Sequence, residues 1–527
     1  MQTLAPDAPP GLGETDPARG PGRRFGSWLA RMLCWLLPTV LTGIVVAYQA
    51  ARPEPWRDEI ASWSAARRST AEIWAMGQHI DGVTVPYYLL AHWSMALFGD
   101  SVLALRIPSL IAVTATTAVT ALLARRLWGP RAALVAGLLV AAMPVMSRYA
   151  QEARGYAFAA LFAVLSTLLL TRALDRSRWA SWVAYALSIV LLGLAHQIAL
   201  LLLIGHLVAV VASGWRRLVW WVPAVLLAVA AVVPFARLGL GQRGAQLDWL
   251  TAARPVDLAT IAGTIFISGV IGGAVCAFAT IALRNREWWG VLLFLTALLP
   301  VLALYAIDQL ITPMFVGRYL IFVVPLLCAL AGRGLSLLGL PIGVTAVLVL
   351  AAVGLPLQDE IRRTHSAFDY RAAARLIQAG QIPGDAIVYA PRDGWQFTDI
   401  AMDYYAVGPF PRDVLKQSDE LRNASLWATE CADPAACFAT VDRVWTLSAD
   451  NLETGRRAGL TDQLSFPVQA LLTSSFVPLQ QSRVDGFTIG LFVRRRAQPV
   501  REARTPADRH WGPGTAQSTC CVDSFVD

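Results

Sequence analysis

The chain has 527 residues, of which 56% are hydrophobic and 15% charged, and it carries a net charge of +8 with a mean hydropathy of +0.51. An ordinary soluble domain has about 25% charged residues. Here the charges fall in short clusters between apolar runs, and a soluble core could bury one or two such runs but not ten. The composition therefore excludes a soluble globular protein and predicts an integral membrane protein.

The positive charge is almost entirely arginine, with Lys416 as the single lysine. These arginines lie in the loops between apolar runs, where membrane topology accounts for them. The sequence has no basic helix interleaved with aromatic residues, so a nucleic-acid partner is not expected.

Residues 1–27 are rich in Pro and Gly and show no apolar periodicity, which predicts a disordered cytoplasmic leader. The arginine clusters that follow set the orientation, because cytoplasmic loops collect Arg and Lys. Eleven apolar runs are long enough to span the membrane, and an odd number of spans carries the chain from the cytoplasm to the outside. The runs are 32–50, 102–124, 131–147, 156–171, 180–195, 197–213, 218–236, 257–283, 288–305, 319–332 and 336–356. The predicted fold class is an α-helical polytopic membrane protein of about eleven transmembrane helices over residues 28–357.

Two extracytoplasmic parts follow from this topology. The first external loop covers 51–101, and its run Tyr87 to Phe98 is too short and polar to cross, which indicates an interfacial helix. Residues 358–497 predict an extracytoplasmic α/β domain, followed by a disordered tail over 498–527. In this domain we expect a helix over Asp369–Gln378 and strands over Ala386–Ala390, Val441–Leu447 and Gly486–Val493. Cys431 and Cys437 form either a disulfide or two free thiols, and Cys520 and Cys521 lie in the tail.

Acidic residues gather in the external loops rather than inside the spans. The first loop holds Asp58, Glu59 and Asp81, and the second holds Glu152. Transporters place ionisable groups at mid-membrane, so this distribution favours chemistry at the outer surface. Asp58 and Glu59 could accept a proton or hold a cation, or they could simply favour the start of a helix.

Several short motifs follow one another over about 100 residues, from Asp58 to Tyr156. This segment resembles the N-terminal half of lipid-linked-sugar glycosyltransferases of the GT-C superfamily, nearest to the protein O-mannosyltransferase and aminoarabinose transferase-like group (glycosyltransferase family 39). The motifs are Asp58-Glu59, His79-Ile-Asp81, Pro86-Tyr-Tyr-Leu-Leu90 with His92, Leu105-Arg-Ile-Pro-Ser109, Arg125-Arg-Leu-Trp-Gly129 and Ser147-Arg-Tyr-Ala-Gln-Glu-Ala-Arg-Gly-Tyr156.

The resemblance implies a site that faces outward and transfers a mannose-like sugar, with inversion, from a polyprenyl-phosphate donor. It implies that Asp58 is the base, that Glu59 supports it and that Glu152 is a second acid. Further positions follow for donor and phosphate binding, namely Arg154, Tyr156, Arg318 and Tyr319, although Arg318 could instead be an interface anchor. Many relatives have His-Pro-Pro or Lys-Pro-Pro where Thr84-Val-Pro86 stands here, which puts a phosphate contact at that point in doubt.

A substrate loop is expected from His79, Asp81, Tyr87, Tyr88 and His196. For His79 and Asp81, hydrogen bonds that shape the loop are favoured over a shared metal ion. For His196, a structural hydrogen bond explains the residue as well as substrate contact does. No cofactor is certain. A divalent cation, if one binds, would use Asp58 and Glu152. The expected partners are the donor lipid, the bilayer and a glycan, lipid or protein acceptor. The alternatives are a transporter or lipid flippase without transferase activity, or a non-catalytic scaffold.

Overall fold

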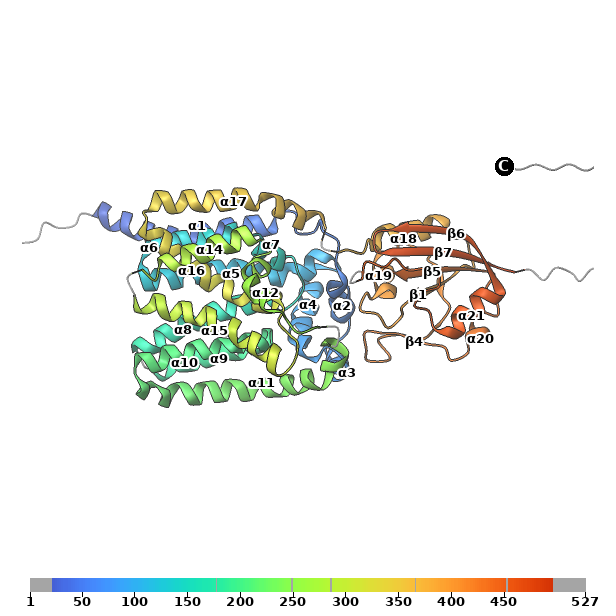
Figure 1. Cartoon of the computed structure of the whole chain (residues 1–527), viewed down its shortest axis with the longest axis horizontal. Helices are drawn as coiled ribbons and strands as arrows, with labels where there is room; N and C mark the ends of the chain where they lie inside the picture. The colour runs from blue at the N-terminus through green and yellow to red at the C-terminus, as the bar shows by residue number, and fades with distance from the viewer. Residues whose placement is uncertain are drawn as a thin grey trace, which may run out of the picture.

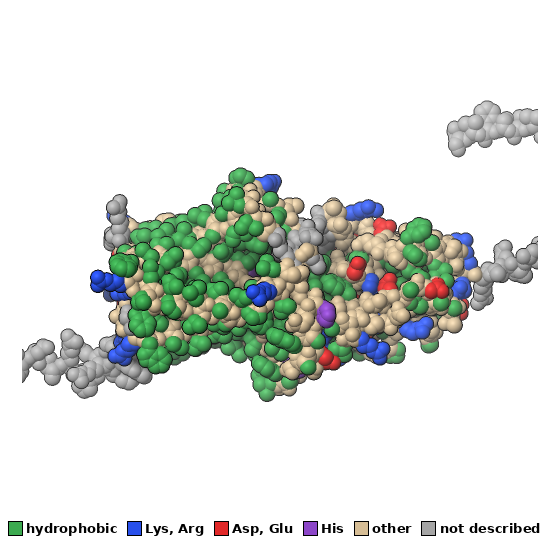
Figure 2. Space-filling model, turned by 90° about the horizontal axis from the view of Figure 1, so that it is seen from below, with side chains coloured by type: hydrophobic (Ala, Val, Ile, Leu, Met, Phe, Trp, Pro, Cys, Tyr) green, Lys and Arg blue, Asp and Glu red, His purple; other side chains and the backbone are tan. Residues whose placement is uncertain are grey.

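The computed structural model describes residues 21–176, 178–247, 250–284, 287–364, 366–451 and 454–495. Of the disordered leader predicted over residues 1–27, residues 1–20 lie outside these ranges, as does the tail with Cys520 and Cys521. The prediction is wrong for residues 21–27, which form the start of a helix. The chain forms a bundle of helices that lie side by side, with a smaller α/β domain at one end of the bundle (Figure 1). Hydrophobic side chains cover the sides of the bundle, whereas charged side chains are scattered over the C-terminal domain (Figure 2).

Several helices are long and apolar enough to cross a membrane. They are α5 (Val102–Trp128), α8 (Tyr156–Arg176), α11 (Leu218–Leu247), α15 (Trp288–Leu310), η4 with α16 (Gly317–Val323 and Val324–Leu337) and α17 (Leu340–Arg363). Shorter apolar stretches complete the bundle: Met32–Ala47 within α1 (Pro21–Ala47), α9 (Trp179–Ala195), η2 with α10 (Gln197–Leu201 and Leu202–Ser213) and α14 (Gly269–Ile281). The polytopic helical fold class is confirmed, whereas the number of eleven spans remains a prediction.

One span contains a sharp bend. Helices α6 (Pro130–Ala142) and α7 (Pro144–Ala150) meet at Met143 with an angle of 63°. Proline lacks a backbone N–H and cannot continue the hydrogen-bond ladder of the preceding helix, so Pro144 starts a new helix instead. The short helix α7 then carries the chain into the segment around Glu152.

The prediction of one continuous span over 257–283 is wrong. The chain forms two one-turn helices, α12 (Pro255–Ala259) and α13 (Ile261–Ile265), before α14 begins. Ile267 has a φ of +53°, and the Ser268 side chain accepts the N–H of Ile271 as the N-cap of α14. Both features end one helix and start another, which an apolar pattern alone does not reveal. Helix α11 also extends eleven residues past the predicted end at 236, to Leu247.

The first external loop is largely helical and lies at the end of the bundle next to the C-terminal domain (Figure 1). It contains α2 (Arg57–Ala66), α3 (Thr70–His79), η1 (Gly82–Thr84) and α4 (Val85–Phe98), the last of which confirms a helix over 87–98. Helix α11 reaches beyond the bundle and holds this loop through Gln242. Its side chain accepts the N–H of Gly82 at 2.8 Å and donates to the carbonyl of Gly77 at 2.9 Å.

The C-terminal domain is built on a five-stranded sheet in the order β2-β1-β5-β7-β6. Strand β1 is parallel to both of its neighbours, and β7 is antiparallel to both of its own. The strands are β1 (Ala386–Ala390), β2 (Arg412–Asp413), β5 (Arg443–Ala449), β6 (Phe476–Val484) and β7 (Phe487–Arg494), with a separate pair β3 (Lys416–Ser418) and β4 (Thr429–Glu430). The helices are α18 (Tyr370–Gly380), α19 (Thr398–Tyr405), α20 (Pro434–Cys437) and α21 (Phe466–Ser475), and a disulfide joins Cys431 to Cys437.

The C-terminal domain packs directly on the first external loop. One hydrophobic cluster contains residues of both, including Ile60 and Trp63 of α2 and Ile400 and Met402 of α19. The rings of Trp63 and Tyr404 meet edge to face at 5.1 Å. The helix that carries Asp58 therefore forms part of the interface between the two parts.

Candidate active site

Asp58 lies in the first turn of α2, where the chain leaves the bundle. Its side chain is 20% exposed, and its oxygens lie 3.7 Å from Arg57 Nε and 3.9 Å from Arg154 Nε. The helix N-cap is Trp56, and no side chain caps this end. A carboxylate near a helix N-terminus is stabilised by the helix dipole. Asp58 is thus held near two guanidinium groups by loose contacts that leave it accessible.

Glu59 has a different environment although it is the next residue. Its side chain is fully buried and accepts from Arg106 Nε at 2.7 Å and Arg106 Nη2 at 2.6 Å. Arg106 also donates to the backbone carbonyls of Ala50 and Pro53 at 2.7 and 3.0 Å. This bidentate pair joins the start of α2 to α5 and to the end of the first span. The geometry makes Glu59 a positioning residue for Asp58.

Glu152 lies in the turn after α7 and is 2% exposed. Its Oε2 is 3.7 Å from Arg148 Nε, and its Oε1 is buried without a hydrogen bond from the described residues. Burial raises the pKa of Glu152 to about 7, and the charges of Asp58 and Glu59 add to this, while Arg148 and Arg318 oppose it. Near neutral pH this carboxyl can therefore hold a proton.

Arg154 connects the second external loop to the first. Its Nη1 donates to Asp81 Oδ2 at 2.9 Å, to Tyr88 Oη at 3.0 Å and to Thr84 Oγ1 at 3.3 Å. The hydroxyls of Tyr88 and Thr84 also donate to Asp81, which has a left-handed φ of +56°. Burial disfavours the charged form of Asp81, but Arg154 and the two hydroxyls outweigh it, so the pKa of Asp81 lies below its ordinary value. Asp81 is therefore an anionic anchor for Arg154.

Three aromatic rings contact one another next to Arg318. Tyr156, His196 and Tyr319 lie in series, tilted by 37° and 46°, with ring centroids 5.4 and 5.3 Å apart. The guanidinium of Arg318 lies 5.6 Å from the ring centroid of Tyr319. Residues from α8, from the turn between α9 and η2, and from η4 thus meet, although they are far apart in the sequence.

Buried polar atoms without hydrogen bonds concentrate in this region. Buried polar groups in proteins are normally satisfied, so a cluster of exceptions indicates a place where a polar ligand or water binds. Those atoms of this region that no described residue satisfies are Trp56 Nε1, Gln151 Oε1, Glu152 Oε1, Arg154 Nε and His196 Nδ1. Donors and acceptors are both present, so the cluster suits a ligand that offers both.

Two predicted site residues lie apart from this cluster. His79 is exposed, and its Nδ1 lies 3.0 Å from the Ala75 carbonyl of its own helix. Tyr87 is buried, and its hydroxyl donates to the Leu105 carbonyl at 3.2 Å and lies 3.0 Å from Ser109 Oγ. Among the described residues, no three His, Cys, Asp or Glu side chains group closely enough to hold a metal ion.

Three further residues contribute to the site. Trp56 and Arg148 face each other, with the guanidinium carbon 5.6 Å from the ring centroid, and Arg106 fixes Glu59. A signal existed for Arg106, because a charge near the start of an apolar run is rarely tolerated without a partner. Arg148 lies within the motif Ser147–Tyr156 and Trp56 lies two residues before Asp58, but the sequence does not show that these two side chains meet.

Comparisons with known proteins agree with this architecture. Residues 84–239 match the family model described as dolichyl-phosphate-mannose-protein mannosyltransferase. Two crystal structures of ArnT from Cupriavidus metallidurans share the fold. The apo form has a TM-score of 0.57 and 14% identity, covering 89% of this chain and 98% of ArnT. The form bound to undecaprenyl phosphate has a TM-score of 0.55 and 15% identity, covering 87% and 98%.

An oligosaccharyltransferase from Archaeoglobus fulgidus, tethered to an acceptor peptide, is more distant, with a TM-score of 0.47 and 13% identity over 90% of this chain and 76% of that one. No curated protein sequence matches the chain. The GT-C resemblance inferred from the sequence motifs is confirmed by the family model and by the shared fold of ArnT.

Proposed function

We propose that the chain is a membrane glycosyltransferase that moves a sugar from a polyprenyl-phosphate donor to the hydroxyl of an acceptor. The observation that carries this proposal is the meeting of Asp58, Glu152, Arg154 and Arg318 around buried polar atoms that lack partners among the described residues. The description of the matching family and the undecaprenyl phosphate bound to ArnT support a lipid-linked donor. The same description supports a mannose-like sugar.

Asp58 acts as the general base in this proposal. The acceptor oxygen forms a bond to the anomeric carbon while its proton passes to Asp58. The bond between that carbon and the phosphate oxygen breaks, and the polyprenyl phosphate leaves with the electron pair. Attack opposite the leaving group inverts the configuration at the anomeric carbon.

The leaving phosphate develops negative charge, which preorganised cations stabilise. Arg318 lies at the start of η4, where this span begins, so it is suited to a phosphate at headgroup depth. Protonated Glu152 can donate a hydrogen bond to the same group or to a sugar hydroxyl. Arg154 keeps the Asp58 side of the site positively charged.

A transporter or flippase is the rival from another class. Such proteins carry ionisable groups at mid-membrane, along the path of the substrate. The charged groups of this site instead lie in the external loop and the turn after α7, next to the C-terminal domain. We therefore favour the transferase.

The test is transfer of radiolabelled sugar from synthetic polyprenyl-phosphate donors in membranes that contain the protein. Asp58→Asn should reduce the rate by at least about a hundredfold, the usual contribution of a general base. Asp100→Asn is the matched control, because Asp100 lies in the same loop and bonds Trp63 and Arg67 instead. Full activity of Asp58→Asn would remove Asp58 from the role, and failure of every donor in the wild-type protein would refute the transferase.

A further inference from the structure

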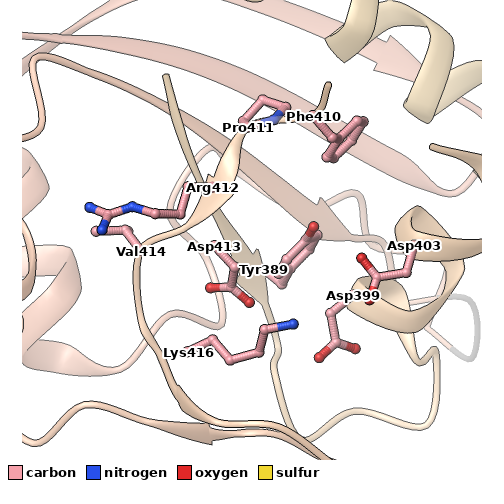
Figure 3. A pocket seen from close by; sticks show the side chains of 9 residues that line it. All are labelled: Tyr389, Asp399, Asp403, Phe410, Pro411, Arg412, Asp413, Val414 and Lys416. Carbon is pink, nitrogen blue, oxygen red and sulfur yellow. The ribbon is translucent and has the colours of Figure 1, made fainter. Parts of the chain in front are cut away.

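A polar pocket opens in the C-terminal domain, away from the site of transfer. It has a volume of about 420 Å³ and lies beside β1, where Asp399, Asp403, Asp413 and Lys416 surround Tyr389 (Figure 3). Strand β2 pairs only with Ala386 and Ile387 of β1, so the rest of that edge borders the pocket. The carboxyl ends of parallel strands are a common place for ligands in open α/β sheets.

Part of this cluster has a structural role. Arg392 follows β1 and donates to both oxygens of Asp413 at 2.6 Å, to Asp399 at 3.1 Å and to Glu430 at 3.1 Å. The guanidinium also lies 5.2 Å from the ring centroid of Tyr389. These contacts fix the loop after β1 and give Asp399 and Asp413 a cationic partner, so these two side chains need no ligand to explain them.

Tyr389, Asp403 and Lys416 are not explained in this way. Tyr389 is 4% exposed, and its hydroxyl lines the open pocket, where no described residue forms a hydrogen bond with it. Asp403 lies four residues after Asp399 on the same face of α19, and Lys416 begins β3 across the pocket (Figure 3). Asp403 and Lys416 are exposed residues, and their side chains likewise have no hydrogen bond or ion pair within the described part of the chain, so both are free to contact a ligand.

The ligand class follows from these groups. Tyr389 and Lys416 can donate, Asp403 can accept, and Phe410 with Pro411 supplies an apolar wall. The lining carries Asp399, Asp403 and Asp413 against Arg412 and Lys416, and Arg392 bonds two of these aspartates. The charges therefore nearly balance, which favours a neutral ligand over an anion or an amine. A ring with neighbouring hydroxyl groups offers donors and acceptors at this spacing as well as an apolar face. We propose that this pocket binds a neutral sugar residue.

A metal ion is a poorer occupant. Divalent cations prefer several oxygen ligands at one point. Within the ranges that the structure describes, the carboxylates of this pocket do not form a group of three that could hold an ion. Arg392 already occupies both oxygens of Asp413.

The inference deepens the proposed function and rests on it in one respect. A sugar site in the domain that packs on the Asp58 loop would hold the glycan of an acceptor, so the acceptor class becomes a saccharide. The binding itself requires no transfer, and it is measured separately.

The experiment is saturation-transfer difference NMR on the full-length protein in detergent, with methyl α-mannoside, methyl α-glucoside and methyl β-galactoside as probes at millimolar concentration. At least one probe should give signals in the wild-type protein. Tyr389→Phe keeps the ring over Arg392 and removes only the hydroxyl, and it should weaken binding roughly two- to tenfold. Asp403→Asn should weaken it by about tenfold or more, because a charged acceptor is lost.

Two controls separate the possible results. Asp442→Asn changes a 91% exposed carboxylate of the same domain and should leave the signals unchanged. Asp58→Asn should abolish transfer and leave the signals intact, so failure of the proposed transferase does not imitate failure of the pocket. The inference is overturned if no probe binds, if Tyr389→Phe and Asp403→Asn bind like the wild type, or if Asp58→Asn removes the signals.

Discussion

The adjacent acids Asp58 and Glu59 should respond to substitution in opposite ways. Glu59→Gln leaves the fully buried guanidinium of Arg106 against a neutral amide, where two bonds at 2.6 and 2.7 Å had held a carboxylate. Breaking a buried ion pair by removing one partner costs about 3–5 kcal/mol. We therefore expect the melting temperature to fall by on the order of 10 °C.

The measurement is tryptophan fluorescence on heating the detergent-purified protein, together with the yield of folded protein. Asp58→Asn is the matched control and should melt like the wild type, because its contacts are long and its side chain is partly exposed. The double change Glu59→Leu with Arg106→Leu should recover only part of the loss, since Arg106 also bonds the carbonyls of Ala50 and Pro53. If Glu59→Gln melts like the wild type but loses transfer, Glu59 contacts substrate and the reasoning fails.

Three further outcomes are expected. The contribution of Glu152 to the free energy of unfolding should fall as pH rises from about 4.5 to 7, because the pKa of Glu152 is about 7 when folded against 4.5 ordinarily, so the folded protein binds more protons at this group. Glu152→Gln removes this contribution, so the unfolding free energy of the variant should fall less, or rise more, over this window than that of the wild type. Identical slopes in denaturation curves of the two proteins would contradict the assignment. Gly155→Ala should slow transfer about tenfold or more, because the added Cβ would lie 2.3 Å from the Ala195 carbonyl oxygen and would displace His196 from Tyr156. The control is Gly241→Ala, where the added Cβ meets nothing within 4 Å. Glu54→Gln breaks a 2.9 Å pair with Arg371 that is partly exposed, so the unfolding free energy should change by at most about 1 kcal/mol. Trypsin should nevertheless cut between the bundle and the C-terminal domain faster in this variant, and equal cleavage rates would show that the pair does not hold the two parts together.

Much of the fold could be predicted because apolar runs and periodicity are local signals. Strand β1 occupies Ala386–Ala390 as predicted, and α18 begins within one residue of the predicted start. Strand β6 was missed because it is an edge strand whose residues are mostly exposed, so its pattern is polar. The breaks around Ile267 were missed because one left-handed residue leaves no trace in hydropathy.

The candidate site could be predicted only in its residue types. Asp58 and Glu152 were predicted from acidic charge in the external loops together with the family resemblance, and Arg154 from the resemblance alone; their roles stay predictions. The separate environments of Asp58 and Glu59 could not be predicted, since they depend on Arg106 lying opposite one carboxylate and not the other. His79 was expected in the substrate loop from its place in a motif, but the helix of α3 continues through it and leaves it exposed.

The joint hydrophobic cluster changes how truncation experiments can be interpreted. Removing everything after α17 would leave Ile60 and Trp63 in contact with water, on the same short helix that bears the proposed base. Inactivity of such a fragment would thus report a disturbed α2 as readily as a missing acceptor site. Single side-chain changes at Tyr389 or Asp403 leave the contact between α2 and the C-terminal domain intact. They therefore test the role of this domain without disturbing the helix that carries Asp58.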